Sequence, residues 1–182
     1  MGALVKSGDH QAVVELVAEE QNQYLTFQLG GEMFAIGILN IKEIIEYGSL
    51  TEVPMMPVFI RGVINLRGAV VPVVDLSARF GRKRTEVTRR TCIVIIEVES
   101  EDEKHDVGLV VDSVSEVLEI AAAEIEPAPS FGTLIRSDFI HGMGKVDGKF
   151  VIILSVNNVL SMDDLATLEN VAAGDVPLLA EA

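Results

Sequence analysis

A single arginine separates two almost wholly apolar segments, and this arrangement constrains the fold more than any other feature of the chain. The segments, Gly62 to Leu66 and Ala69 to Leu76, are rich in Val, Ile and Leu, which is typical of strands buried on both sides. Asn65 and Gly68 bracket the break between them and tolerate the backbone angles of a tight turn. We therefore expect Arg67 to project from a rigid corner with its charge at the surface, as a docking feature.

Similar short signals recur along the chain and predict a succession of strands. Gly30 with Gly31, and Asp147 with Gly148, are two-residue connections suited to hairpins. Asp75 is positioned to cap a single helical turn. Many short strands with little helix favour small antiparallel barrels and a mostly β fold. Further strands are expected at Ile41 to Tyr47, at Thr91 to Val98 paired with Val107 to Val111, and at Val114 to Ile120 continuing that same sheet, before a C-terminal helix from Ser161 to about Val171.

The charge balance restricts the partners that such a chain can bind. Its 14 Lys and Arg against 28 Asp and Glu give a formal net charge of −14 at pH 7, which repels phosphate backbones and anionic lipids. No apolar run approaches the roughly 20 residues that cross a bilayer, and the first residues lack the apolar core of a signal peptide. We expect a cytoplasmic protein that binds no nucleic acid and does not insert directly into the membrane.

The titratable residues show no pattern typical of catalysis or of a metal site. His10, His105 and His141 are scattered and lie outside ligand spacing of one another and of Cys92. Cys92 lies in an apolar strand-like run without an adjacent base, so we expect a core residue rather than a nucleophile. No serine occupies a nucleophile elbow, although a catalytic triad can be distant in sequence. The sequence predicts no enzyme, no cofactor and no metal, with a small hydrolase as the alternative from another functional class.

Four spaced motifs together resemble the CheW family, the coupling proteins of bacterial chemotaxis. They are IGILNIKEIIEY, FIRGVI, NLRG with VPVVDL, and VGLVVDSVSEVL, in the family's order over about Gln21 to Asn170. The resemblance implies two intertwined five-stranded SH3-like β-barrels with a C-terminal helix. It implies a flexible tail at 1–20, a CheW-like domain at 21–173 and a second flexible tail at 174–182, the first barrel comprising 21–68 plus 146–171 and the second comprising 69–145.

The same resemblance implies a function. A CheW-like protein is a non-catalytic adaptor that links the cytoplasmic tips of methyl-accepting chemoreceptors to the regulatory domain of the histidine kinase CheA, at receptor arrays on the inner membrane. Family positions matching Glu43, Asn65 and Arg67 belong to receptor and kinase coupling. We expect these three residues to bind the receptor together with Val70 and Val110, in a groove between the barrels.

Two points remain open at the level of sequence. The resemblance places the strand pair containing Ile38 and Ile41 against the kinase, whereas apolar strand residues more often face the core. Glu43 and Arg67 form either a structural ion pair or the rim of a partner groove, and these two interpretations are compatible. A coupling protein of a parallel pathway, for pilus or gliding motility, is the alternative function within the same fold.

Overall fold

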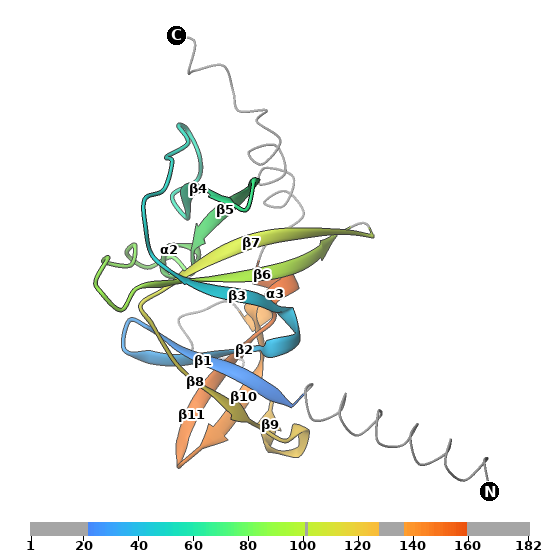
Figure 1. Cartoon of the computed structure of the whole chain (residues 1–182). Helices are drawn as coiled ribbons and strands as arrows, with labels where there is room; N and C mark the ends of the chain where they lie inside the picture. The colour runs from blue at the N-terminus through green and yellow to red at the C-terminus, as the bar shows by residue number, and fades with distance from the viewer. Residues whose placement is uncertain (1–21, 101, 128–136, 160–182) are drawn as a thin grey trace, which may run out of the picture.

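The computed structural model describes residues 22–100, 102–127 and 137–159, and in this part of the chain all eleven strands belong to two mixed sheets (Figure 1). The six-stranded sheet has the order β8-β1-β2-β11-β10-β9, and the five-stranded sheet, above it in Figure 1, has the order β3-β6-β7-β5-β4. The fold is mostly β as predicted, with one sheet of six strands where five were expected. The predicted tails and the predicted helix after Ser161 lie outside the described residues.

The elements are short, as the sequence predicts. The strands are β1 (Gln23–Leu29), β2 (Glu32–Gly37), β3 (Ile41–Glu46), β4 (Ile60–Leu66), β5 (Ala69–Asp75), β6 (Cys92–Ser100), β7 (Glu103–Val111), β8 (Ser113–Glu119), β9 (Ile125–Glu126), β10 (Ile140–Val146) and β11 (Lys149–Leu154). The helical turns are η1 (Ile38–Asn40), α2 (Leu76–Arg79), η2 (Ala122–Glu124), η3 (Ser137–Phe139) and α3 (Val156–Val159). The predicted strands are present, but the sequence interpretation missed the two-residue β9 and most of β10.

The predicted hairpin turns are confirmed. Gly30 and Gly31, between β1 and β2, have φ angles of 57° and 83°, and Asp147 and Gly148, between β10 and β11, have φ angles of 51° and 77°. Two successive positive φ angles give the turn whose twist matches that of the flanking strands. Asp75 also caps α2 as expected, because its carboxylate accepts a hydrogen bond from the Ala78 amide at 3.1 Å.

Strands from distant parts of the chain share the six-stranded sheet. β11 runs parallel to β2, with Phe34 opposite Ile152. β8 pairs with β1, so the expectation that it continues the sheet of β6 and β7 is wrong. Asp112 causes this change of direction, since its amide donates to the Gln28 carbonyl at 3.0 Å and its carboxylate accepts from the Gly30 amide at 2.8 Å. The chain leaving β7 is thereby attached to β1.

The strand pairing also divides the chain differently from the predicted barrel ranges. β3 and β4, expected in the first barrel, form the two edges of the five-stranded sheet, whereas β8, β9 and most of β10, expected in the second barrel, lie in the six-stranded sheet. Near the β4 edge, a bridge between Thr51 and Val63 ties the chain after β3 to β4. Gly62 permits this close approach, because its φ is 147° and the Thr51 carbonyl occupies the place of a Cβ. Long-range pairings of this kind have no local sequence signal.

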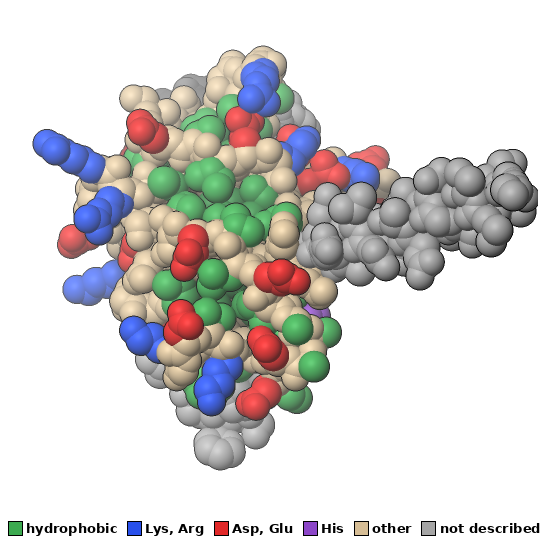
Figure 2. Space-filling view, turned by 60° about the horizontal axis from the view of Figure 1, so that its bottom comes forward, with side chains coloured by type: hydrophobic (Ala, Val, Ile, Leu, Met, Phe, Trp, Pro, Cys, Tyr) green, Lys and Arg blue, Asp and Glu red, His purple; other side chains and the backbone are tan. Residues whose placement is uncertain are grey.

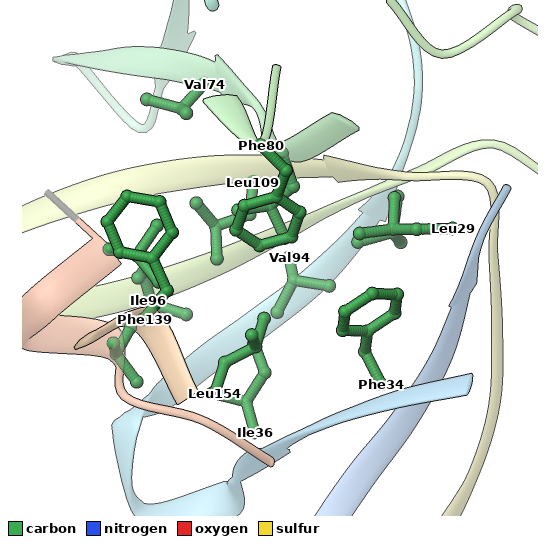
Figure 3. Packing of buried hydrophobic residues seen from close by; sticks show 14 of the residues in the cluster. Leu29, Phe34, Ile36, Val74, Phe80, Val94, Ile96, Leu109, Phe139 and Leu154 are labelled. Atoms are coloured by element: carbon green, nitrogen blue, oxygen red, sulfur yellow. The ribbon is translucent and has the colours of Figure 1, made fainter. Parts of the chain in front are cut away.

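One hydrophobic core lies between the two sheets and is shared by them. Figure 3 shows side chains from both, such as Phe34 and Ile36 of β2 facing Val94 and Ile96 of β6. Each sheet has in addition a smaller core on its other side, one around Ile153 and one around Ile93. The two barrels are thus joined over a continuous apolar interface.

Candidate protein-binding site

A two-residue turn joins β4 to β5 and carries the arginine singled out by the sequence. Leu66 pairs with Ala69, and between them Arg67 and Gly68 have φ angles of 53° and 86°. The Asn65 Oδ1 atom accepts a hydrogen bond from the Gly68 amide at 3.0 Å and closes the turn. A left-handed φ is uncommon for arginine. The predicted tight turn is confirmed, but Asn65 supports it through its side chain while Arg67 adopts the unusual backbone angle.

Arg67 forms an exposed ion pair with Glu43 of β3. The Arg67 Nη2 atom donates to Glu43 Oε2 at 3.0 Å, while the arginine side chain is 79% exposed and the glutamate side chain 24%. Because β3 and β4 are opposite edges of the five-stranded sheet, this pair spans the two edges. Exposed ion pairs typically contribute less than about 1 kcal/mol to stability. The pair therefore orients the guanidinium and leaves most of it open to a carboxylate or carbonyl of a partner.

The two valines expected beside this corner differ in exposure. Val70 lies opposite Asn65 in the β4–β5 register and is 43% exposed, so it can contact a partner directly. Val110 is fully buried in the small core around Ile93. Its expected role as a receptor contact is corrected accordingly: Val110 packs inside the barrel and can only support the surface. A run such as Leu109 to Val111 is apolar on both faces and does not reveal which side chains reach the surface.

A cleft of about 380 Å³ opens beside the turn, between the two edges of the five-stranded sheet. Ile45 at the end of β3 and Ile64 of β4 are apolar residues of its lining, and Asn65 belongs to both the cleft and the turn. We define the Arg67 corner as Glu43, Asn65, Arg67 and Val70. Charged, polar and apolar groups thus lie together at a hairpin end and the facing strand β3, next to a cleft of mixed polar and apolar lining.

The residues expected to bind the kinase are half-buried. Ile38 in η1 and Ile41 at the start of β3 both pack against the core shared by the sheets. Leu39 between them is 56% exposed. The single turn of η1 places Leu39 outward, which the strand interpretation of this segment missed. This segment, Ile38 to Ile41, thus offers an exposed aliphatic side chain on a well-packed base.

A groove between the two sheets lies elsewhere than expected. It has a volume of about 640 Å³ and is lined neither by the Arg67 corner nor by the strand Val107 to Val111. One side of the groove is formed by part of β1 and the start of β8, in the six-stranded sheet. The other side is formed by the end of β3 and the start of β6, in the five-stranded sheet, together with the residues before β6. The lining residues are Gln28, Glu46, Arg89, Arg90, Cys92, Ser113, Val114 and Ser115.

Cys92 was expected in the core and is only partly there, because its side chain packs against the shared core but also lines this groove. Its thiol is partly buried and donates a hydrogen bond to the Arg90 carbonyl at 3.3 Å. Burial raises the pKa of the Cys92 thiol, which keeps the sulfur protonated and weakly nucleophilic. Among the described residues, no three His, Cys, Asp or Glu side chains come together as a metal site would require.

The arginine within β4, Arg61, was missed by the sequence interpretation. The Arg61 Nε atom donates to Asp75 Oδ2 at 2.8 Å, and its Nη2 atom donates to the Thr85 carbonyl. The Thr85 amide donates to the same Asp75 oxygen at 3.1 Å. The sequence did contain a signal for this pair, because Arg61 interrupts an apolar strand and Asp75 ends the strand that follows it. The turn between the two strands fixes their register, with Ile60 opposite Val74, and this register brings Arg61 and Asp75 close together.

The six-stranded sheet presents exposed apolar side chains of its own. Val117 of β8 and Phe150 of β11 are both exposed, and Phe150 lines a cleft of about 530 Å³ with Met33 and Met143. Figure 2, which brings the lower end of the molecule in Figure 1 forward, shows hydrophobic patches bordered by acidic side chains. This surface lies on the other sheet from the Arg67 corner, so the protein has distinct surfaces on its two barrels.

Comparison with known sequences shows the family. A sequence model of the CheW-like domain matches residues 23–164. The chain belongs to the CheW family. The chemotaxis protein CheW of Klebsiella aerogenes is 34% identical over 161 residues, which cover 88% of this chain and 95% of that protein. Protein FrzA of Myxococcus xanthus is 30% identical over 115 residues, which cover 63% of this chain and 69% of that protein.

A solved structure supports the same conclusion for the fold. The crystal structure of the scaffolding protein TtCheW from Thermoanaerobacter tengcongensis matches with a TM-score of 0.70 at 34% identity, covering 79% of this chain and 90% of that chain. The protein is a CheW-like scaffolding protein of chemotaxis and, as a member of this non-catalytic family, is not an enzyme. In the part of the chain that the structure describes, no helix has the length and apolar character needed to span a bilayer.

Proposed function

We propose that this CheW-family protein couples the cytoplasmic tips of methyl-accepting chemoreceptors to the regulatory domain of the histidine kinase CheA. The observation that carries the proposal is the Arg67 corner, where a rigid turn displays a guanidinium that contributes little to the stability of the fold. The protein acts in the cytoplasm and is recruited to receptor arrays at the inner membrane.

The receptor binds at the Arg67 corner. A receptor tip is a helical hairpin, and a helix binds by placing apolar anchors into a cleft while polar groups at the rim fix its orientation. Val70 and the cleft between β3 and β4 supply the apolar contacts, and Arg67, Glu43 and Asn65 supply the polar rim. Val110 supports this surface from inside the barrel.

The kinase binds at the segment Ile38 to Ile41. Leu39 is its exposed anchor, and the half-buried Ile38 and Ile41 hold the segment in place through the shared core. The segment connects β2 of one sheet to β3 of the other. The two partners thus use different residues of the protein.

Reconstitution with purified components tests the proposal. We expect kinase activity to respond to receptor only when this protein is added. Arg67→Glu should lower recovery of the receptor fragment by about tenfold or more, because it replaces a charge-assisted contact by a repulsive one. Lys145→Glu, the same charge change at an exposed site of β10, is the matched control and should bind normally.

A charge swap separates the ion pair from the partner contact. The double variant Glu43→Arg with Arg67→Glu can re-form a pair between β3 and the turn, but it presents the wrong charge to the receptor. Continued loss of receptor binding supports direct contact by Arg67. Full recovery in the swap, or normal binding by Arg67→Glu alone, would refute the proposed receptor site.

The kinase site is tested in the same assay. Leu39→Lys should weaken kinase binding and leave receptor binding unchanged, whereas Val87→Lys, at a similarly exposed valine, should affect neither. Leu39 is preferred to Ile38 for this test, because a charge at the half-buried Ile38 also disturbs the core. Kinase binding that survives Leu39→Lys would show that the kinase site lies elsewhere.

A further inference from the structure

Arg79, the last residue of α2, lies between two aromatic rings from distant parts of the chain. Its guanidinium carbon is 4.9 Å from the centre of the Phe59 ring and 5.0 Å from the centre of the Phe139 ring. Its Nε atom donates a hydrogen bond to the Val159 carbonyl at 2.7 Å. A cation between two ring faces, with a directed hydrogen bond in addition, is a geometrically specific contact.

These contacts connect the two barrels. Arg79 and Phe59 belong to segments flanking β5 and β4, in the five-stranded sheet. Phe139 ends η3 immediately before β10, and Val159 ends α3 shortly after β11, so both are attached to the six-stranded sheet. The Ser155 amide donates to the Phe139 carbonyl at 2.8 Å and ties η3 to the start of α3. The Arg79 side chain thus joins the end of α2 to η3 and α3, the two helical turns on either side of the β10–β11 hairpin.

The rest of the interface is mostly apolar, which explains why such a contact matters. A row of aromatic rings crosses the shared core. The centroids of Phe27 and Phe34 are 6.1 Å apart and those of Phe34 and Phe80 are 5.8 Å apart, both pairs being stacked. Phe80 and Phe139 follow at 5.8 Å in a tilted arrangement, and Figure 3 labels Phe34, Phe80 and Phe139. Hydrophobic burial is strong but non-directional, so it holds the barrels together without fixing their relative rotation. Besides Asp112, which ties the end of β7 to β1, the hydrogen bond of Arg79 supplies a direction.

A second arginine also crosses between the barrels, but in a weaker setting. The Arg82 Nη2 atom lies 2.8 Å from Glu32 Oε1, whose side chain is 45% exposed. Water competes for such a pair, and its contribution is small. Arg79 instead donates to a backbone carbonyl, so the position of its acceptor does not depend on a second side chain.

We propose that Arg79 is a positioning residue that fixes the orientation of the two barrels relative to each other. With the barrels held as one body, a receptor at the Arg67 corner of the five-stranded sheet and a kinase at the segment Ile38 to Ile41, which packs against the core shared with the six-stranded sheet, keep a fixed geometry. This consequence rests on the proposed coupling function. The positioning itself is a property of the isolated protein and is measurable without any partner.

Distance measurements between two spin labels test the positioning directly. In a Cys92→Ala background, which removes the only cysteine of the chain, labels are attached at Lys104→Cys on β7 and Lys149→Cys on β11, two exposed sites on different sheets. With Arg79 in place we expect one narrow distance distribution. Arg79→Gln, which removes the cation, should broaden it by about twofold or add a second population, since interfaces switch between discrete arrangements.

Two further variants make the test specific. Arg79→Lys keeps a cation between the rings but loses the Nε donor, so its distribution should lie between those of the parent and Arg79→Gln. Arg84→Gln is the matched control, because the Arg84 Nε atom also donates to a backbone carbonyl, that of Val58, but on the five-stranded side only. Its distribution should equal that of the parent.

The outcomes are separable. A distribution for Arg79→Gln as narrow as that of the parent overturns the positioning role, and if this variant does not fold, an equally narrow distribution for Arg79→Lys overturns it instead. In the reconstituted assay, Arg79→Gln should bind receptor and kinase singly within about twofold of the parent and still lose most of the kinase response. A parent protein that fails to couple would instead refute the proposed function and leave the distance result unaffected.

Discussion

One arginine lies near the start of β4 and another directly after its end, and the two have opposite roles. Arg61 pairs with Asp75 at 2.8 Å, and their side chains are 13% and 0% exposed. Arg67 pairs with Glu43 at 3.0 Å, and their side chains are 79% and 24% exposed. The chemistry of the two pairs is the same and the distances are similar, so the difference between them comes from their surroundings.

The surroundings decide what each pair can do. Asp75 accepts hydrogen bonds from Arg61 and from the amides of Ala78 and Thr85, so it joins β4, α2 and the following loop. Removing one member of such a pair leaves a buried charge without compensation. Arg67 and Glu43 are exposed, so each can give up its ion-pair partner and bind water instead at little cost in free energy. The buried pair therefore supports the fold, while the exposed pair remains available for binding.

The largest expected effect is that of Asp75→Ala. This change leaves the Arg61 charge buried and also removes the cap of α2, and we expect a loss of about 3–5 kcal/mol in the free energy of unfolding. Urea denaturation followed by circular dichroism measures it. Asp75→Asn keeps an acceptor for the Ala78 amide and should lose less. A loss below about 1 kcal/mol for Asp75→Ala would erase the contrast between the two pairs.

An intermediate effect is expected for Asn65→Ala. The change removes the acceptor of the Gly68 amide and so loosens the turn that presents Arg67, for a loss of about 1 kcal/mol in unfolding free energy. Asn65→Asp retains an acceptor oxygen and serves as the comparison. The same denaturation assay applies, and equal stability of Asn65→Ala and the parent would argue against a supporting role of this side chain in the turn.

The smallest expected effect on stability is that of Arg67→Ala. Because the pair is exposed, the loss should stay below about 1 kcal/mol and should shrink further in 1 M NaCl, where the Debye length is about 3 Å. Denaturation at low and high salt checks both points. A loss above about 2 kcal/mol would mean that the Arg67 corner is structural, and the proposed function would lose its main support.

Features set by neighbouring residues were predictable from the sequence. The turns at Gly30 and at Asp147, the tight turn at Arg67 and the cap at Asp75 each depend on a few adjacent side chains with restricted backbone angles. The resemblance of the motifs to the CheW family made the overall fold predictable as well. Whether Glu43 and Arg67 touch was not decidable, because the contact depends on how β3 and the β4–β5 turn are placed in space.

Features set by distant residues were not predictable from local patterns. The pairing of β8 with β1 follows from the hydrogen bonds of Asp112 to the first hairpin, far away along the chain. The burial of Val110 follows from the strands on either side of β7. In both cases several arrangements suit the local pattern equally well, and long-range packing selects one of them.

The parallel pairing of β2 with β11 has a consequence for biosynthesis. The first hairpin leaves the ribosome early, but the strand that completes its sheet on the β2 side is made only near the end of the chain. Until then β2 has an unpaired edge, the kind of edge that invites aggregation. The edge of β2 therefore stays open to pairing with other chains until β11 has been synthesised.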